Sequence, residues 1–286
     1  MQPLILDLDA SVGTLPGETR IDLRGWHDRL RFACSLRQLQ VFDQHVSSRL
    51  PPAHGPVLFG SGDFHHLSLP LIARTSAPRP MRVLVFDNHP DNMRFPFGVH
   101  CGSWVSRVAA LPHVARVDVV GITSHDIAAA HAWENRLLPL YRGRLCYWSI
   151  GVETGWSRRL GLRRAFRNFH TASTMMAALL GDFTLDECPV YLSIDKDVLA
   201  PDEARSNWDQ GCLRVADLEH AIVALRHRLI GSDINGEVSI ANYPQRWKRM
   251  LSAIDGQPEL DDKTLAEYQA QQHAVNLRLL GVLQGG

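Results

Sequence analysis

Three side chains of metal-binding type stand close together in the segment Asp87-Asn88-His89-Pro90-Asp91. The segment follows residues 82–86, an apolar run that is typical of a buried strand. Alternate residues of an extended chain share one face, so Asp87, His89 and Asp91 could converge on a single site. The alternative interpretation is a polar turn that caps the next helix.

A second carboxylate pair, Asp195 and Asp197, follows the apolar run 190–194. Two like charges at this spacing repel each other unless a positive charge lies between them, and a divalent cation would supply that charge. Lys196 points to the opposite face if the segment stays extended. The alternative here is a solvated loop.

A third polar cluster, Gly60-Ser61-Gly62-Asp63-Phe64-His65-His66, follows the apolar run 57–59. Glycines allow tight backbone bends near a ligand, and the adjacent histidines offer imidazole nitrogens. With the carboxylates, these histidines make a mixed nitrogen and oxygen ligand set. Such a set suits manganese or another borderline first-row metal better than calcium or a thiolate-bound zinc.

The sequence predicts strands that alternate with helices in the segments that position these side chains. Short apolar runs end in polar or glycine-rich turns, and the stretches between them have apolar residues near helical spacing. The predicted strands are residues 4–8, 57–60, 82–86, 117–122, 146–152, 190–194 and 229–234, and the clearest helices are 102–110, 171–180 and 215–227. This alternation predicts an α/β fold, a three-layer αβα sandwich with a mainly parallel sheet. Ligands of such sheets bind beyond the carboxyl ends of the strands, where the polar clusters stand.

We expect residues 1–286 to form a single domain. The Pro and Gly clusters around residues 51–56 and 76–80 are short, and each precedes another strand of the same pattern. Residues 261–283 predict one long helix that closes the domain or contacts another subunit. We therefore also expect a homo-oligomer.

Composition narrows the classes of partner. The 30 Lys and Arg balance the 30 Asp and Glu, which gives no net field to attract nucleic acid or an anionic membrane, so a small-molecule partner is favoured. The five cysteines are scattered and form no CxxC pair, which argues against a disulfide framework and a thiolate zinc site.

No apolar stretch approaches the roughly 20 residues that span a bilayer. The N-terminal residues lack the pattern of a secretory signal, so we expect a cytoplasmic location.

Taken in order along the chain, five motifs resemble those of the ureohydrolase family, whose members include arginase, agmatinase and formimidoylglutamase. The family carries GGDH, DAHxD, a later HG, SxDxDxxDP and an EVNP-like segment. The counterparts here are Gly60 to His66, Asp87 to Asp91, His100-Cys101-Gly102, Ser193 to Pro201 and Gly236 to Ser239. The resemblance implies an arginase-like fold and a hydrolase that cleaves a C–N bond of a guanidino or amidino compound, releasing urea and an amine.

The resemblance also implies which side chains do the chemistry. Two divalent metal ions, Mn²⁺ by preference with Ni²⁺, Zn²⁺ or Fe²⁺ as alternatives, are implied to bind His65, Asp87, His89, Asp91, Asp195 and Asp197. Asp91 is implied to align the attacking water, His100 to shuttle a proton and Glu237 to receive the cationic group of the substrate. His65 fits the family's spacing to Pro70, but Phe64 stands where the family has aspartate, so His66 stays an alternative.

The chain departs from the family pattern at several positions. Asn88 replaces the usual alanine, Ala200 replaces the last aspartate of SxDxDxxDP, and Ser239-Ile240 replaces an Asn-Pro pair. The segment Glu203 to Gly211 lacks the family's PGTGTP-like loop. Two other hypotheses therefore stay open: an amide hydrolase of the histone-deacetylase type with one zinc ion, and a metal-binding relative without turnover. The number of carboxylates favours two metals over one, and the altered loop is the main support for the inactive relative.

Overall fold

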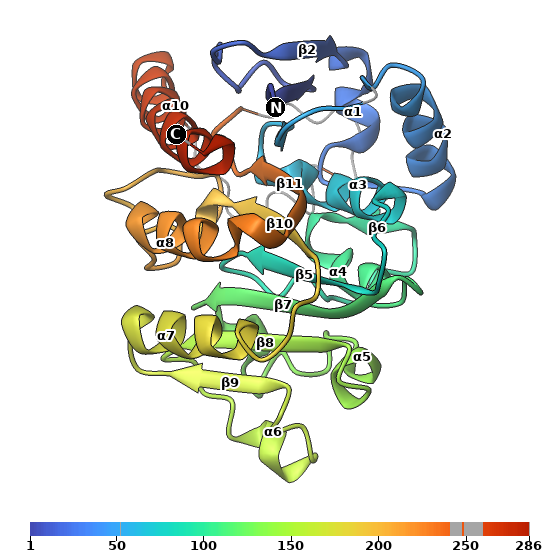
Figure 1. Ribbon diagram of the computed structural model, residues 1–286. Helices are drawn as coiled ribbons and strands as arrows, with labels where there is room; N and C mark the ends of the chain where they lie inside the picture. The colour runs from blue at the N-terminus through green and yellow to red at the C-terminus, as the bar shows by residue number, and fades with distance from the viewer. Residues whose placement is uncertain (52, 241–247, 249–259, 286) are drawn as a thin grey trace.

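The computed structural model describes the chain except for residues 52, 241–247, 249–259 and 286. At its centre lies a nine-stranded sheet in the order β2-β1-β4-β11-β10-β5-β7-β8-β9, and every neighbouring pair is parallel (Figure 1). The strands are β1 (Leu4–Asp7), β2 (Thr19–Asp22), β4 (Val57–Leu58), β5 (Met81–Phe86), β7 (Val114–Ile122), β8 (Leu145–Ile150), β9 (Phe166–Phe169), β10 (Val190–Asp195) and β11 (Leu229–Asn235).

Helices cover both faces of this sheet. They are α1 (His27–Leu30), α2 (Leu36–Ser47), α3 (Ser68–Arg74), α4 (Val105–Val108), α5 (Leu137–Tyr141), α6 (Trp156–Arg159), α7 (Ala172–Phe183), α8 (Val215–Leu225) and α10 (Asp262–Gln284). Side chains of β5 alternate between two cores, as the pleat of a strand requires. Val83 and Val85 pack in the core that includes α2 to α5, whereas Leu84 and Phe86 pack in the core that includes α7, α8 and α10. The predicted three-layer αβα sandwich is confirmed.

The register brings the ends of the central strands to one edge. Ile194 of β10 pairs with Phe86 of β5 on one side and with Ile234 of β11 on the other, and Ile234 also pairs with Leu58 of β4. Each of the three predicted ligand clusters follows one of these strands. The topology therefore places all three clusters at the same edge, as expected for an open parallel sheet.

A second, two-stranded sheet lies beside this edge. Its antiparallel strands are β3 (Ala33–Cys34) and β6 (Val99–His100), with Ala33 paired to His100. The predicted helix 102–110 is wrong in extent, because a 3-10 turn, Cys101–Ser103, comes first and α4 spans only Val105–Val108. Gly102 has non-helical backbone angles, and the ring of His100 accepts a hydrogen bond from its N–H.

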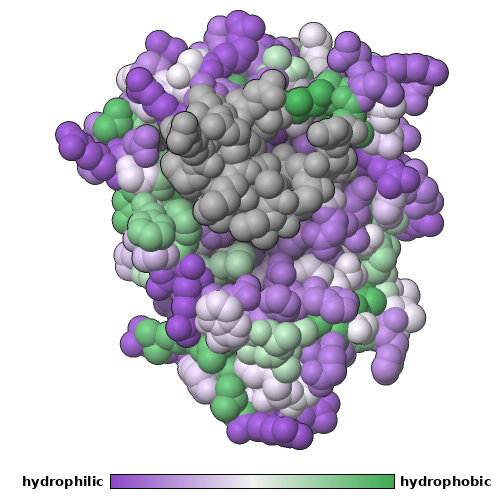
Figure 2. Space-filling view, turned by 180° about the vertical axis from the view of Figure 1, so that it is seen from behind, coloured by the Kyte–Doolittle hydropathy of each residue, from purple (hydrophilic) through white to green (hydrophobic). Residues whose placement is uncertain are grey.

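Within the described ranges, no helix combines the length and the apolar character that crossing a bilayer would need. Figure 2 shows the face opposite to that of Figure 1, where green apolar groups lie among purple polar ones in several separate places. The homo-oligomeric state and the single-domain organisation stay predictions.

Candidate metal centre

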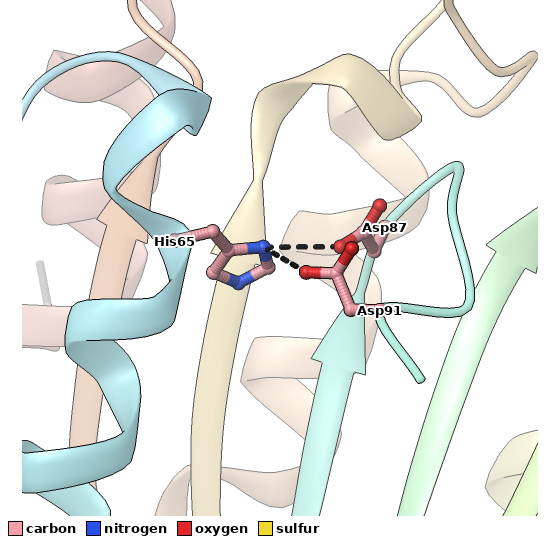
Figure 3. Close-up of side chains that lie close together, drawn as sticks. All are labelled: His65, Asp87 and Asp91. Atoms are coloured by element: carbon pink, nitrogen blue, oxygen red, sulfur yellow. Dashed lines mark ion pairs between the residues drawn. The ribbon is translucent and has the colours of Figure 1, made fainter. Parts of the chain in front are cut away.

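His65 lies in a 3-10 helix, Gly62–Leu67, that follows β4 and faces the ends of β5 and β10. Figure 3 shows its ring turned toward two carboxylates. Nδ1 lies 3.0 Å from Asp91 Oδ2 and 3.1 Å from Asp87 Oδ2. Asp195 Oδ2 lies 3.5 Å from the same nitrogen. One imidazole nitrogen therefore meets three carboxylates that come from two different strands.

A buried chain of hydrogen bonds holds the other side of this ring. His65 Nε2 lies 3.1 Å from Ser193 Oγ, which donates to Asp233 Oδ1 at 2.7 Å. Asp233 also accepts from Ser68 Oγ at 2.9 Å and from the hydroxyl of Tyr191 at 2.8 Å. With Nε2 engaged in this way, Nδ1 is left to face the carboxylates. The motifs gave no signal for Asp233, because only the register of β11 brings it beneath Ser193.

The neighbouring His66 does not join this group. Its side chain is fully buried, and among the described residues neither ring nitrogen has a hydrogen-bond partner. Burial lowers the pKa of His66 well below its ordinary value, so the ring is neutral. Of the two histidines that the sequence left open, the structure brings His65 to the carboxylates.

A second nitrogen reaches the same carboxylates from His89. Its Nδ1 lies 2.9 Å from Asp197 Oδ2 and 3.5 Å from Asp87 Oδ1. The two oxygens of Asp87 thus face different histidines, Oδ1 toward His89 and Oδ2 toward His65. Among the described residues, two groups of side chains have the spacing of metal ligands and share Asp87: His65, Asp87 and Asp91 form one, and Asp87, His89 and Asp197 form the other.

Asp195 ends β10 close to both groups, and two glycines make room for it. Its Oδ2 faces His65, and its Oδ1 accepts from the N–H of Asp197 at 3.1 Å. A Cβ at Gly62 would lie 2.8 Å from Asp195 Oδ2, and a Cβ at Gly236, where φ is +89°, would lie 2.4 Å from Asp195 Oδ1. Any larger residue at Gly236 would push this carboxylate out of place.

Four buried aspartates concentrate negative charge in the centre, and added positive charge would stabilise them. Four aspartate residues, each at most 5% exposed, make up the acidic part of the centre; they are Asp87, Asp91, Asp195 and Asp197. Burial and the charge of Asp197 raise the pKa of Asp195 well above its ordinary value. Burial and the charge of Asp87 raise the pKa of Asp91 to about 7 and that of Asp197 to about 6. Carboxylates that repel one another in this way are stabilised by divalent cations between them.

Asp87 differs from the other three carboxylates. Burial opposes its ionisation, but the contacts from His65 and His89 outweigh burial and lower its pKa. Its Oδ2 is buried and accepts no hydrogen bond from the described residues. An anionic oxygen without a donor, facing a histidine nitrogen, fits a metal ligand. The nitrogen and carboxylate donors match the set expected for Mn²⁺ and its first-row neighbours.

Asp91 is held by a residue that the motifs did not indicate. The indole Nε1 of the fully buried Trp104 donates to Asp91 Oδ2 at 2.5 Å. The N–H of Val105 donates to the carbonyl of Asp91 at 3.0 Å. The backbone of Asp91 has φ of +45°, a conformation that aspartate tolerates better than most residues. These contacts fix the carboxylate toward His65.

His100 lies at the wall of a cavity that opens over these ligands. The cavity has a volume of about 590 Å³, and Phe32, Phe95 and Trp208 line its walls. The His100 ring lies nearly parallel to Phe32, with centroids 6.0 Å apart, and meets Phe95 edge-on at 4.7 Å. Burial lowers the pKa of His100 to about 4, so its ring is neutral near pH 7.

All six predicted ligands also line this cavity; they are His65, Asp87, His89, Asp91, Asp195 and Asp197. The lining also includes three further acidic residues, Asp126, Glu134 and Asp209, together with Arg94 and His131. The structure therefore brings the six ligands and His100 into one cavity. Their chemical roles stay predictions.

Glu237 is placed differently. It is not among the residues that line the cavity, and its side chain is 1% exposed. Its Oε1 accepts from Lys196 Nζ at 2.5 Å and from Asn276 Nδ2 at 2.7 Å. Lys196 Nζ also donates to Asn276 Oδ1 at 2.8 Å. The partner of Glu237 is thus a cation of the protein itself, and its role toward a substrate stays a prediction.

No protein-family model matches the chain. An uncharacterised protein of Thermotoga maritima is 30% identical over 211 residues, which make up 72% of this chain and 67% of that protein.

The fold is similar to that of solved ureohydrolase structures. Agmatine ureohydrolase of Thermoplasma volcanium aligns with a TM-score of 0.56 and 11% identity, covering 99% of this chain and 90% of that one. Arginase of Bacillus subtilis aligns with a TM-score of 0.55 and 16% identity, covering 100% and 98%. Proclavaminate amidino hydrolase of Streptomyces clavuligerus aligns with a TM-score of 0.51 and 16% identity, covering 99% and 92%. The resemblance that the motifs indicated is confirmed in the fold.

Proposed function

We propose that this chain, which belongs to one family with the Thermotoga maritima protein and has the arginase fold, is a divergent ureohydrolase. In this proposal it hydrolyses a C–N bond of a guanidino or amidino compound with the help of two divalent metal ions. One observation carries it: two ligand groups meet at the carboxyl edge of the sheet and share Asp87. A carboxylate shared between two sites suits a binuclear centre, because it can serve both ions.

Each metal ion would have its own histidine. His65 Nδ1 and Asp91 would belong to one ion, His89 Nδ1 and Asp197 to the other, and Asp87 and Asp195 lie where they could serve both. Two bound divalent ions would lower the pKa of a water molecule from about 15.7 toward about 7, which produces a nucleophile near neutral pH. We expect Mn²⁺ to be the preferred ion.

The side chains around the centre would position the water and move protons. Asp91, fixed by Trp104, would accept a hydrogen bond from the attacking water. His100 is neutral near pH 7, so it can take up a proton and pass it to the departing amine. The aromatic walls formed by Phe32 and Trp208 would offer π-faces to a cationic or apolar arm of the substrate.

Replacement of His100 tests its role separately from metal binding. His100→Asn should lower kcat by roughly 10²-fold, within the range for loss of a general acid or base, while the bound metal per chain stays unchanged. Steady-state kinetics combined with elemental analysis measures both quantities. Unchanged kcat would remove His100 from the mechanism.

The activity itself is tested on a panel of compounds. The protein, stripped with a chelator and reloaded with Mn²⁺ or Ni²⁺, should release urea or an amine from at least one guanidino or amidino compound. The chelated protein should be inactive. Inactivity toward the whole panel with both metals would contradict the proposal, and ligand-dependent thermal stabilisation without product would favour the relative without turnover.

The pairing of Glu237 with Lys196 favours one other candidate function. A substrate that is neutral at the reacting carbon needs no carboxylate to receive a cation, so the same centre could cleave an amide. An amide panel run beside the first one distinguishes the two candidates. Metal analysis that finds one tightly held zinc ion per chain, with amide turnover, would establish the deacetylase-like hypothesis.

We also propose the homo-oligomeric state and the cytoplasmic location that the sequence predicts.

A further inference from the structure

The loop of residues 203–211, where the chain departs from the ureohydrolase pattern, contacts the candidate metal centre directly. Asp209 Oδ1 lies 2.6 Å from Nε2 of His89. The other nitrogen of the same ring, Nδ1, faces Asp197 and Asp87. The ring of His89 is therefore held between the candidate ligands on one side and a carboxylate of this loop on the other.

This placement determines which ring nitrogen carries the proton. An imidazole that binds a metal through Nδ1 must hold its remaining proton on Nε2. A carboxylate at 2.6 Å from Nε2 accepts that proton in a hydrogen bond, fixes the ring orientation and makes Nδ1 a better donor. Asp209 is in the position to accept this hydrogen bond from His89.

Asn88 in turn holds Asp209. Its Nδ2 donates to the carbonyl oxygen of Asp209 at 3.0 Å and to Oδ2 at 3.2 Å. Its Oδ1 accepts from the N–H and the hydroxyl of Thr123, at 3.0 and 2.6 Å. Asn88 is fully buried, and both ends of its side-chain amide take part in these four contacts. An alanine at this position, as in the family pattern, would make none of these side-chain bonds.

Hydrogen bonds also hold the loop on either side of Asp209. Asn207 exchanges two hydrogen bonds of 2.9 Å with the backbone of Ser239. The N–H of Gly211 donates to the carbonyl of Asp197 at 2.7 Å. A Cβ at Gly211 would lie 2.4 Å from the carbonyl oxygen of Val198, so only glycine allows the chain to pass this close. The loop is thus built onto the centre.

We propose that Asp209, held in place by Asn88, is a positioning residue for His89 in the metal centre. The two departures from the family pattern, at Asn88 and in the loop 203–211, then serve one purpose, which is to hold the ring of His89. The proposal rests on the metal centre of the proposed function, but it concerns only the hold on His89 and makes no statement about substrate.

The test measures metal binding without substrate. Mn²⁺ is titrated into the chelated protein by calorimetry, and Co²⁺ is added separately to record the visible absorption of the bound ion. Asp209→Asn keeps the shape of the side chain but loses its charge, so one of the two ions should bind about 10- to 100-fold more weakly. The Co²⁺ spectrum should change as well, because the geometry at His89 changes.

The matched control is Asp202→Asn. Asp202 lies just before the same loop, is as exposed as Asp209 (66% and 67%) and pairs with Arg214 rather than His89. It should bind Mn²⁺ and Co²⁺ as the wild type does. Asn88→Ala should weaken the same ion, and the double variant with Asp209→Asn should be little weaker than Asp209→Asn alone, because both changes release one contact.

The possible failures are distinguishable. Wild-type affinities and an unchanged Co²⁺ spectrum in Asp209→Asn would overturn the role of Asp209, although the centre would stand. Fully additive losses in the double variant would overturn the role of Asn88. Wild-type protein that binds no Mn²⁺ or Co²⁺ would overturn the metal centre and, with it, the proposed function.

Discussion

Asp87→Asn should weaken the binding of both metal ions. The carboxylate of Asp87 belongs to both ligand groups, and its two oxygens face different histidines. Loss of a charge-assisted contact costs about 1.5–3 kcal/mol, so two lost contacts cost about 3–6 kcal/mol. This corresponds to a loss of roughly 10²- to 10⁴-fold in metal affinity. Calorimetric titration with Mn²⁺ measures it directly.

Asp126→Asn is the control for this experiment. Asp126 lines the same cavity and carries the same charge, but it belongs to neither ligand group among the described residues. Its variant should bind Mn²⁺ nearly as the wild type does. If Asp87→Asn also retained two ions with unchanged affinity, Asp87 would not be a shared ligand and the binuclear centre would lose its main support.

Asp197→Asn should have a smaller and more selective effect. Asp197 belongs only to the ligand group that contains His89, so the ion bound there should be lost first. Activity should fall together with that ion, since the proposed reaction requires both. Elemental analysis before and after dialysis, with turnover measured on the same samples, checks this order of loss.

The sequence predicted the parts of the fold that are buried on both faces. β5 and β10 are continuous apolar runs because helices cover both sides of them, and they were found with almost their observed bounds. β2 and β9 were missed because they form the two edges of the sheet, where polar residues interrupt the apolar pattern, such as the partly exposed Arg20 and the exposed Asn168.

The same distinction applies to the site. Asp87, His89 and Asp91 are close in sequence and follow a strand, so their convergence could be predicted from the pattern alone. Asp233 reaches His65 through Ser193, which lies 128 residues from His65 along the chain, and Asp209 reaches His89 across 120 residues. Strand register and loop packing make these contacts, and no local sequence pattern connects the residues. From the sequence, Trp104 is predicted only to pack in the core, but its indole N–H also donates to the carboxylate of Asp91. Contacts of this kind need the three-dimensional structure.

The pair formed by Lys196 and Glu237 gives the largest expected effect on stability. Lys196 Nζ is fully buried and meets Glu237 Oε1 at 2.5 Å, and Asn276 of α10 bonds to both side chains. Lys196→Met removes the cation and leaves a buried carboxylate that accepts a hydrogen bond from Asn276 among the described residues. Breaking a buried pair in this way costs about 3–5 kcal/mol of the free energy of unfolding.

A double variant separates the pair from any effect on substrate. In Lys196→Met/Glu237→Gln neither side chain is charged, so most of the lost stability should return, because a buried pair replaced as a unit is often nearly neutral. Urea unfolding of the chelated single and double variants measures the recovery. A double variant as unstable as Lys196→Met would mean that the lysine stabilises the fold in some other way.

The double variant also tests the role that the family motif implies for Glu237. If Glu237 serves only to neutralise Lys196, the metal-loaded double variant should keep a kcat/KM close to that of the wild type on its best substrate. If Glu237 instead receives a guanidinium, a cationic substrate loses a charge-assisted hydrogen bond worth about 1.5–3 kcal/mol. In that case kcat/KM falls roughly 10- to 150-fold at full metal occupancy. Because Glu237 already holds an internal cation outside the cavity lining, we expect the first result.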